Sequence, residues 1–213
     1  MADGALAAPA RPDGPPRWVD RQTELSARLV DAARQLMWQA GGPGFTVAQV
    51  VAASDTSLKS FYRLYTGKDE LLVALFRDDA RVGAEALGAL VEEAEDPVER
   101  VRRAVVGLFR FITVDGHLPY AAALVREHLR LAESRPEELR SVLAPFVERF
   151  EHELEAAQAV GRLRPGDPAK DARTLFHLVI SHLHALVCHQ IDDPPEQVAH
   201  DLWAFCFAAL EAR

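Results

Sequence analysis

Short breaks rich in proline, glycine and aspartate divide this chain into segments that each have helical periodicity. The breaks read GGPG at 41–44, EDP at 95–97, VDGHLP at 114–119, ESRP at 133–136, GRLRPGDP at 161–168 and DDPP at 192–195. Such sequences end helices, because glycine tolerates left-handed backbone and proline cannot continue a helix. No segment shows convincing period-two alternation between hairpin turns, so strands are not expected. The pattern predicts an all-α fold.

Several boundaries can be predicted from capping residues. Thr23 is a candidate cap for a first helix, and Thr46 with Gln49 three residues later forms a capping box for a short second helix. A third short helix is expected over 58–65, and Thr66 is the candidate cap of a fourth. Later helices are expected at about 97–114, 119–133, 137–160, 169–190 and 195–211.

Composition limits the classes of protein to consider. The chain has 213 residues and is 49% hydrophobic, which is enough for a sizeable core in one or two domains. No apolar run reaches the roughly 18 residues that cross a membrane, and no secretory signal is expected at the N-terminus. Cys188 and Cys206 lie outside any CxxC pattern. We therefore expect a reduced cytoplasmic protein without a membrane partner.

Charge is distributed unevenly along the chain. The formal net charge is −8, yet residues 17–68 carry seven Lys and Arg against four Asp and Glu. Residues 81–213 carry 15 Lys and Arg against 22 Asp and Glu. An acidic protein with one basic segment does not fit non-specific wrapping of nucleic acid, but it fits a small domain that docks on phosphate.

The predicted third helix has two distinct faces. On a helical wheel Leu58, Phe61 and Tyr65 fall on the inner side. The outer face holds Lys59, Ser60 and Arg63. Such a face can bond phosphates and base edges in a major groove, although two cations on a solvated helix are the simpler alternative. The capped helix before it, the short turn and the absence of carboxylates from 57 to 68 favour DNA binding.

The residues that carry this argument resemble a known family. Residues 23–76 are similar to the helix-turn-helix domain of TetR family transcriptional regulators, chiefly over SLKSFYRLYTGKDELL at 57–72. Matching positions hold Ser57, Ser60, Tyr62, Tyr65 and Lys68, with Phe61 in place of leucine. The resemblance implies an all-helical homodimer whose C-terminal domain binds a small ligand that controls affinity for operator DNA.

The resemblance also implies phosphate contacts. Thr46 at the start of the second helix, Tyr62 through its hydroxyl, and Lys68 at the start of the fourth helix would each bond a phosphate. Ala48 stands where relatives often have a basic residue, so one such contact is missing.

For the third helix the resemblance implies contacts that recognise the DNA sequence. Ser57 and Ser60 would contact the backbone or a base, and Lys59 and Arg63 occupy exposed positions that vary in the family and often contact bases. Asp55 replaces the usual glycine of the turn, which it can do because Asp tolerates left-handed backbone.

The middle helices contain the candidate ligand-binding residues. They are Phe109, Tyr120, Leu124, His128, Phe150 and Phe176. Most simply these side chains form core, and a cavity among them is implied by the resemblance alone. A mostly apolar site predicts a small hydrophobic effector with one hydrogen-bonding end, and not a polyanion.

The last two predicted helices carry a surplus of apolar side chains. These are Leu175, Leu178, Val179, Leu183, Leu186 and Val187 on one, and Leu202, Trp203, Phe205, Phe207 and Leu210 on the other. Two such helices from each subunit can build a four-helix dimer interface, whereas the alternative is that they fill the core of a monomer.

Other chemistry finds little support. His184 with Cys188, and His182 with His189, have spacings that could chelate a metal, but no HExxH or zinc-finger pattern occurs. We expect interface histidines, no metal and no cofactor. Nucleophile elbows, P-loops and GxGxxG motifs are absent from the sequence, so no enzyme is predicted.

Three regions are expected: a disordered arm at 1–19, a three-helix helix-turn-helix domain at 20–67, and a larger C-terminal helical ligand-binding and dimerisation domain at 68–213. The predicted function is a ligand-responsive DNA-binding transcriptional regulator, a repressor released from double-stranded operator DNA by its effector. The alternative is a helical small-molecule-binding protein or enzyme whose basic helix is incidental.

Overall fold

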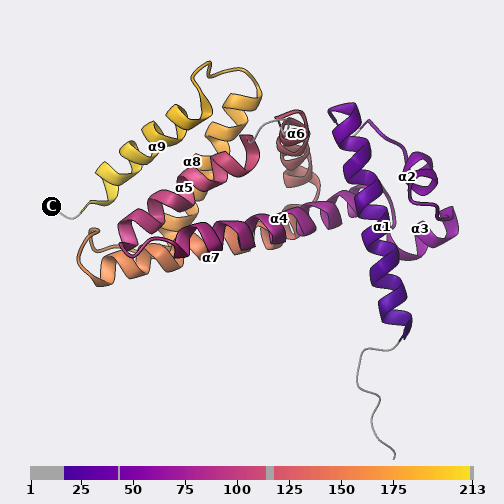
Figure 1. The fold of residues 1–213 in the computed structure, drawn as a ribbon, viewed down its shortest axis with the longest axis horizontal. Coiled ribbons are helices and arrows are strands. Elements are labelled where there is room, and N and C mark those ends of the chain that lie inside the picture. The colour runs from indigo at the N-terminus through magenta and orange to yellow at the C-terminus, as the bar shows by residue number, and fades with distance from the viewer. Residues whose placement is uncertain (1–16, 43, 114–117, 212–213) are drawn as a thin grey trace, which may run out of the picture.

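The computed structural model describes residues 17–42, 44–113 and 118–211, and its named elements there are all α-helices (Figure 1). They are α1 (Arg17–Ala40), α2 (Val47–Ala53), α3 (Leu58–Leu64), α4 (Lys68–Glu92), α5 (Pro97–Thr113), α6 (Leu118–Ser134), α7 (Pro136–Ala159), α8 (Pro168–Val187) and α9 (Pro195–Leu210). The all-α fold is confirmed. No helix in these ranges is long and apolar enough to span a bilayer.

Helices α1, α2 and α3 form a small unit, here called the head. Phe61 of α3 is fully buried in it, together with Leu29 of α1 and Val50 of α2. The predicted capping box of α2 is confirmed, because the Gln49 backbone N–H donates to Thr46 Oγ1 at 3.2 Å and the Thr46 N–H donates to Gln49 Oε1 at 2.8 Å. These bonds satisfy amide groups that would otherwise lack partners at the start of a short helix.

The turn between α2 and α3 is set by Asp55. Its φ is 49°, which lies in the left-handed region that was expected for this position. Arg28 of α1 closes the turn from the other side, with Nη2 donating to the carbonyl oxygen of Ser54 at 2.5 Å and to that of Asp55 at 2.9 Å. The angle between α2 and α3 is therefore fixed by both the backbone and α1.

Substitution of Asp55 tests this account of the turn. Alanine tolerates left-handed backbone poorly, so Asp55→Ala is expected to lower the free energy of unfolding by about 1–2 kcal/mol. Glycine adopts φ 49° without strain, so Asp55→Gly should be as stable as the parent or more so. Urea unfolding of the three proteins measures both changes. Equal loss in the two variants would mean that the carboxylate, and not the backbone, stabilises the turn.

Three predicted boundaries differ from the structure. α1 begins at Arg17, before the candidate cap Thr23, so 17–19 of the predicted disordered arm are helical and 1–16 lie outside the described residues. The N-cap of α4 is Gly67, not Thr66, because the Thr66 N–H and hydroxyl both donate to Glu70 Oε2, at 2.6 and 2.8 Å. α8 ends at Val187, because His189 adopts φ 53°.

Helix α4 connects the head to the remaining helices, which with α4 form the body (Figure 1). It packs on α1 at one end and on α5 and α7 along its length, and α8 packs mainly on α7. Gly83 of α4 permits close packing, because an added Cβ would lie 3.1 Å from the rings of Phe111 and Phe146. The predicted boundary at 67/68 coincides with the start of α4, and the division into domains there stays a prediction.

Candidate functional site

The outer surface of α3 is basic and exposed. Lys59, Tyr62 and Arg63 are exposed, and Tyr62 retains 57% of its accessible surface. The opposite side is anchored by Phe61 and by Tyr65, whose hydroxyl lies 2.7 Å from Ser26 Oγ on α1. α3 therefore projects three DNA-compatible side chains from a rigid support.

Leu58 was expected on the inner face but is 49% exposed. A helical wheel gives directions and not the extent of the core beneath the helix. Under α3 that core is made by Phe61 and Tyr65, and it does not reach the first helical residue.

The cations of α3 differ from those of the body. Among the described residues, no carboxylate forms an ion pair with Lys59 or Arg63. Body arginines commonly do form ion pairs, for example Arg102 with Glu99 at 2.6 Å and Arg130 with Asp69 at 2.7 Å. The two α3 cations are thus available to an external anion.

Some side chains that were predicted to contact DNA already have partners within the protein. Ser57 caps α3, since its Oγ accepts from the Ser60 N–H at 3.1 Å and donates to Ser60 Oγ at 3.0 Å. Thr46 Oγ1 likewise caps α2. The Lys68 ammonium lies 4.6 Å from the centroid of the Phe45 ring, and burial lowers its pKa. Lys59, Tyr62 and Arg63 share one exposed surface, whereas Thr46 and Lys68 lie at helix starts.

A cavity of about 110 Å³ lies inside the body. It is lined by Phe76, Asp79, Ala80, Phe111, Leu124, Val125, His128, Leu143, Phe146, Phe176, Ile180 and Leu183. Three of the predicted ligand-binding residues, Leu124, His128 and Phe176, are in this wall. Phe109 and Phe150 are not, because both are buried in the packed core, 1% and 0% exposed. Tyr120 does not line the cavity but bonds to Asp79, which does.

Larger hollows lie outside this cavity, among them one of about 570 Å³ between α8 and α9 that includes Leu178 and Phe205. One of about 410 Å³ shares His128, Leu143 and Phe176 with the inner cavity and extends to Arg140 and Arg173. Another, of about 820 Å³, is a charged groove of α4 and α7 that includes Arg81, Glu85 and Glu148. The inner cavity is the better candidate for an apolar ligand despite its smaller size, because its wall is almost entirely hydrophobic.

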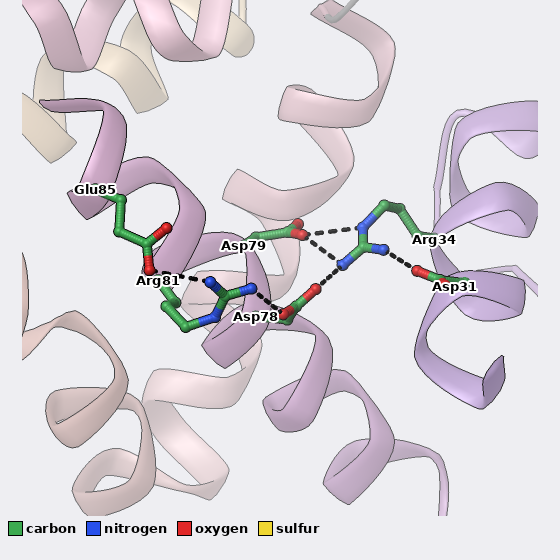
Figure 2. Close-up of polar contacts among 6 residues, drawn as sticks. All are labelled: Asp31, Arg34, Asp78, Asp79, Arg81 and Glu85. Carbon is green, nitrogen blue, oxygen red and sulfur yellow. Dashed lines mark hydrogen bonds and ion pairs between the residues drawn. The ribbon is translucent and has the colours of Figure 1, made fainter. Parts of the chain in front are cut away.

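The sequence did not identify Asp79 as a site residue. Its side chain is 18% exposed and accepts from Arg34 of α1, with Nε at 3.0 Å and Nη2 at 2.9 Å from Oδ1. The Tyr120 hydroxyl of α6 donates to Oδ2 at 2.5 Å. Figure 2 shows Arg34 reaching from α1 to Asp78 and Asp79 of α4. Asp79 in the cavity wall is thus hydrogen-bonded directly to Arg34 of the head.

No local pattern in the sequence singles out Asp79. Asp78 and Asp79 are adjacent, but Asp69 and Glu70 of the same helix are adjacent too, and neither of those lines the cavity. Adjacency of two acids therefore does not identify the one that meets the cavity.

The ionisable groups near the cavity have shifted pKa values. Burial raises the pKa of Asp79, and the hydrogen bond from Tyr120 and the charge of Arg34 oppose that rise. Burial and the charge of Asp79 raise the pKa of Tyr120, so its hydroxyl stays protonated and donates. Burial lowers the pKa of His128, with the nearby His177 and His184 acting in the same direction. His128 is therefore neutral at pH 7.

Helices α8 and α9 each keep apolar side chains uncovered. Phe205 is 69% exposed, and Leu178, Leu186, Trp203 and Phe207 are partly exposed. The other members of the predicted dimer set are buried in the monomer: Leu175, Val179, Leu183, Val187, Leu202 and Leu210. One side of each helix therefore fills the core of the monomer, as the alternative interpretation expected, and the remaining apolar side chains are left uncovered.

The histidine-rich segment of α8 forms no candidate metal centre in the described ranges. His184 Nε2 lies 3.5 Å from Cys188 Sγ, but no group of three or more His, Cys, Asp or Glu side chains gathers there or elsewhere among these residues. His182 Nδ1 lies 2.8 Å from the carbonyl oxygen of Leu178, within its own helix.

Comparison by sequence identifies two family matches. Residues 29–75 match the tetR family of bacterial regulatory proteins, and 99–204 match the C-terminal domain of AefR-like transcriptional repressors. Both descriptions are of regulators, and neither is of an enzyme. No curated protein matches the chain by sequence.

Solved structures with the same fold include three regulators. RolR in complex with resorcinol has 19% identity and a TM-score of 0.69, covering 88% of this chain and 89% of its own. FadR from Bacillus subtilis in complex with stearoyl-CoA has 15% identity and a TM-score of 0.69, covering 84% and 96%. SmeT, the repressor of the Stenotrophomonas maltophilia multidrug efflux pump SmeDEF, has 22% identity and a TM-score of 0.66, covering 87% and 90%.

The two matched segments together cover most of the head and most of the body, and the helix-turn-helix geometry agrees with them. The chain belongs to the TetR family of transcriptional regulators.

Proposed function

We propose that this protein is a homodimeric repressor that binds operator DNA through α3 and leaves it when a small, largely hydrophobic effector occupies the body. The observation that carries the DNA-binding part is the outer face of α3. Lys59 and Arg63 are exposed, lack carboxylate partners among the described residues, and stand on a helix braced from α1. A major groove admits such a helix, and cationic side chains can donate to guanine.

The effector site of this proposal is the inner cavity. It lies against α4, the helix that also packs on the head. Two of the similar structures were solved with a bound small molecule, resorcinol in one and stearoyl-CoA in the other, which supports this use of the body. The hollow that shares His128, Leu143 and Phe176 with the cavity extends the site toward the surface.

Release requires that the effector favour one arrangement of the heads over another. Helix α4 can transmit effector binding to the head, because it contributes Phe76, Asp79 and Ala80 to the cavity wall and packs on α1. An effector that bound both arrangements equally would not release DNA, whatever its affinity.

The test of the proposed function is a gel shift with the DNA that flanks the protein's own gene. We expect a shifted band at low salt that weakens as salt rises, because phosphate contacts release counterions. A protein that shifts neither this DNA nor any sequence selected from a random pool would support the rival function, a small-molecule-binding protein without DNA.

The phosphate contacts give a separate prediction. Tyr62→Phe and Lys68→Ala should each weaken binding by a similar factor for operator and non-operator DNA, because phosphate contacts carry no base information. Titration of both DNAs at several salt concentrations measures this, and Lys68→Ala should lower the salt slope by about one per head. A loss confined to operator DNA would assign base contacts to these side chains instead.

A further inference from the structure

The inner cavity combines aromatic rings with a single carboxylate. Four phenylalanines line it, each from a different helix of the body: Phe76, Phe111, Phe146 and Phe176. The rings of Phe146 and Phe176 stack with their centroids 6.3 Å apart. Ring faces carry negative electrostatic potential and attract cations, so four rings beside a carboxylate are an environment that suits a buried positive charge.

The carboxylate of Asp79 has acceptor capacity left. Oδ1 receives both bonds from Arg34, and Oδ2 receives the Tyr120 hydroxyl. A carboxylate oxygen accepts about two hydrogen bonds, so Oδ2 can take a second donor. Burial raises the pKa of Asp79, and the bonds from Tyr120 and Arg34 oppose that rise, so a further positive charge beside Asp79 would also favour its ionised form.

Arg34 does not depend on Asp79 alone. Its Nη1 lies 2.5 Å from Asp31 Oδ1, and its Nη2 lies 2.6 Å from Asp78 Oδ2 (Figure 2). A second cation that drew Asp79 away would leave Arg34 paired with two carboxylates. Such an exchange therefore strands no buried charge, which would otherwise oppose it strongly.

The wall of the inner cavity itself disfavours anions, whereas Arg140 and Arg173 line only the adjoining hollow. No Lys or Arg lines the inner cavity, and its other ionisable member, His128, is neutral because burial lowers its pKa. A bound carboxylate would face Asp79, whose cationic partner Arg34 does not line the cavity. A neutral ligand would meet no repulsion, but it would gain no attraction from the Asp79 carboxylate.

We propose that the effector is an organic ammonium ion, with a compact apolar body among the phenylalanine rings and its charged nitrogen on Asp79. The proposal rests on the proposed function, since it takes the inner cavity as the effector site, and it names the chemical class of that effector. Because the ammonium competes with Arg34 for Asp79, its binding weakens the bond between the cavity wall and α1. One contact, between the ammonium and Asp79, thus determines the ligand class and also transmits binding to the head.

Three probes of nearly equal size separate the possibilities. Benzylammonium is cationic, benzyl alcohol is neutral and benzoate is anionic, and each has one ring and one polar end. Calorimetry on the full chain without DNA should show benzylammonium binding at least about tenfold more tightly than the other two. Equal affinities, or preference for the alcohol or for benzoate, would overturn the proposal.

A matched pair of variants locates the charge. Asp79→Asn should abolish the preference for benzylammonium, whereas Asp78→Asn should retain it, because Asp78 also pairs with Arg34 but does not line the cavity. Circular dichroism and thermal melting establish that each variant is folded. If both variants lose the preference equally, the surface acids as a group attract the probe, and Asp79 is not the counterion. The probe series on the parent protein decides the ligand class even if Asp79→Asn does not fold.

Failure of this inference and failure of the proposed function give different results. A protein that shifts operator DNA but shows no preference for the cation remains a regulator with another class of effector. If the protein prefers the cation through Asp79 but never binds DNA, the ligand class is supported and the proposed function is wrong.

Discussion

Removing both cations from the outer face of α3 is expected to abolish operator binding. A bidentate contact between a cationic side chain and a base is worth about 1–3 kcal/mol, and each head would lose two of them in Lys59→Ala/Arg63→Ala. We therefore expect operator affinity to fall by at least about a hundredfold, with a smaller loss on unrelated DNA. Neither side chain supports the head's core, so the melting temperature should be unchanged.

The control for this double variant must remove the same charge elsewhere. Arg110 and Arg126 are exposed on the body, and no carboxylate in the described ranges pairs with either. Arg110→Ala/Arg126→Ala lowers the net charge equally and should bind operator like the parent. Gel shifts and salt titrations of both double variants measure the comparison. Parent-like binding by the Lys59/Arg63 variant would show that α3 is not the reading helix.

The head could be predicted closely because its determinants are local. The capping box of Thr46, the left-handed turn at Asp55 and the burial of Phe61 and Tyr65 each depend on residues a few positions apart. Leu58 was misplaced because exposure depends on the extent of the core supplied by other helices. The start of α4 was misplaced by one residue because Glu70 takes both donors of Thr66.

The cavity could be predicted only in part, because its wall combines five helices that are distant in the sequence. Leu124, His128 and Phe176 lie in it, but nothing local distinguishes Leu124 and Phe176 from Phe109 and Phe150, which are also apolar and fill the core. Asp79 was missed because its partners Arg34 and Tyr120 are 45 and 41 residues away. Long-range packing, rather than local pattern, determines which body residues can meet a ligand.

Disruption of the exposed apolar surface around Phe205 and Leu178 is expected to separate the proposed dimer. Phe205→Glu places a carboxylate at the most exposed large apolar side chain of these two helices, and twofold symmetry places it there twice. Burying each unpaired charge opposes association by several kcal/mol. Sedimentation at micromolar concentration should change from dimer to monomer. Operator affinity should fall with it, because two linked heads bind half-sites about one DNA turn apart, roughly 34–36 Å.

The choice of Phe205 separates dissociation from unfolding. Leu183 was a natural choice from sequence, but it is 1% exposed and lines the cavity, so Leu183→Glu would damage the monomer itself. Phe205 is uncovered in the single chain, so its replacement should leave circular dichroism and binding of cavity ligands intact. Val82→Glu is the matched control, because Val82 is also exposed, 46%, but lies on α4. A Phe205→Glu protein that still sediments as a dimer would place the interface on another face, and dissociation of the Val82→Glu protein would point to α4.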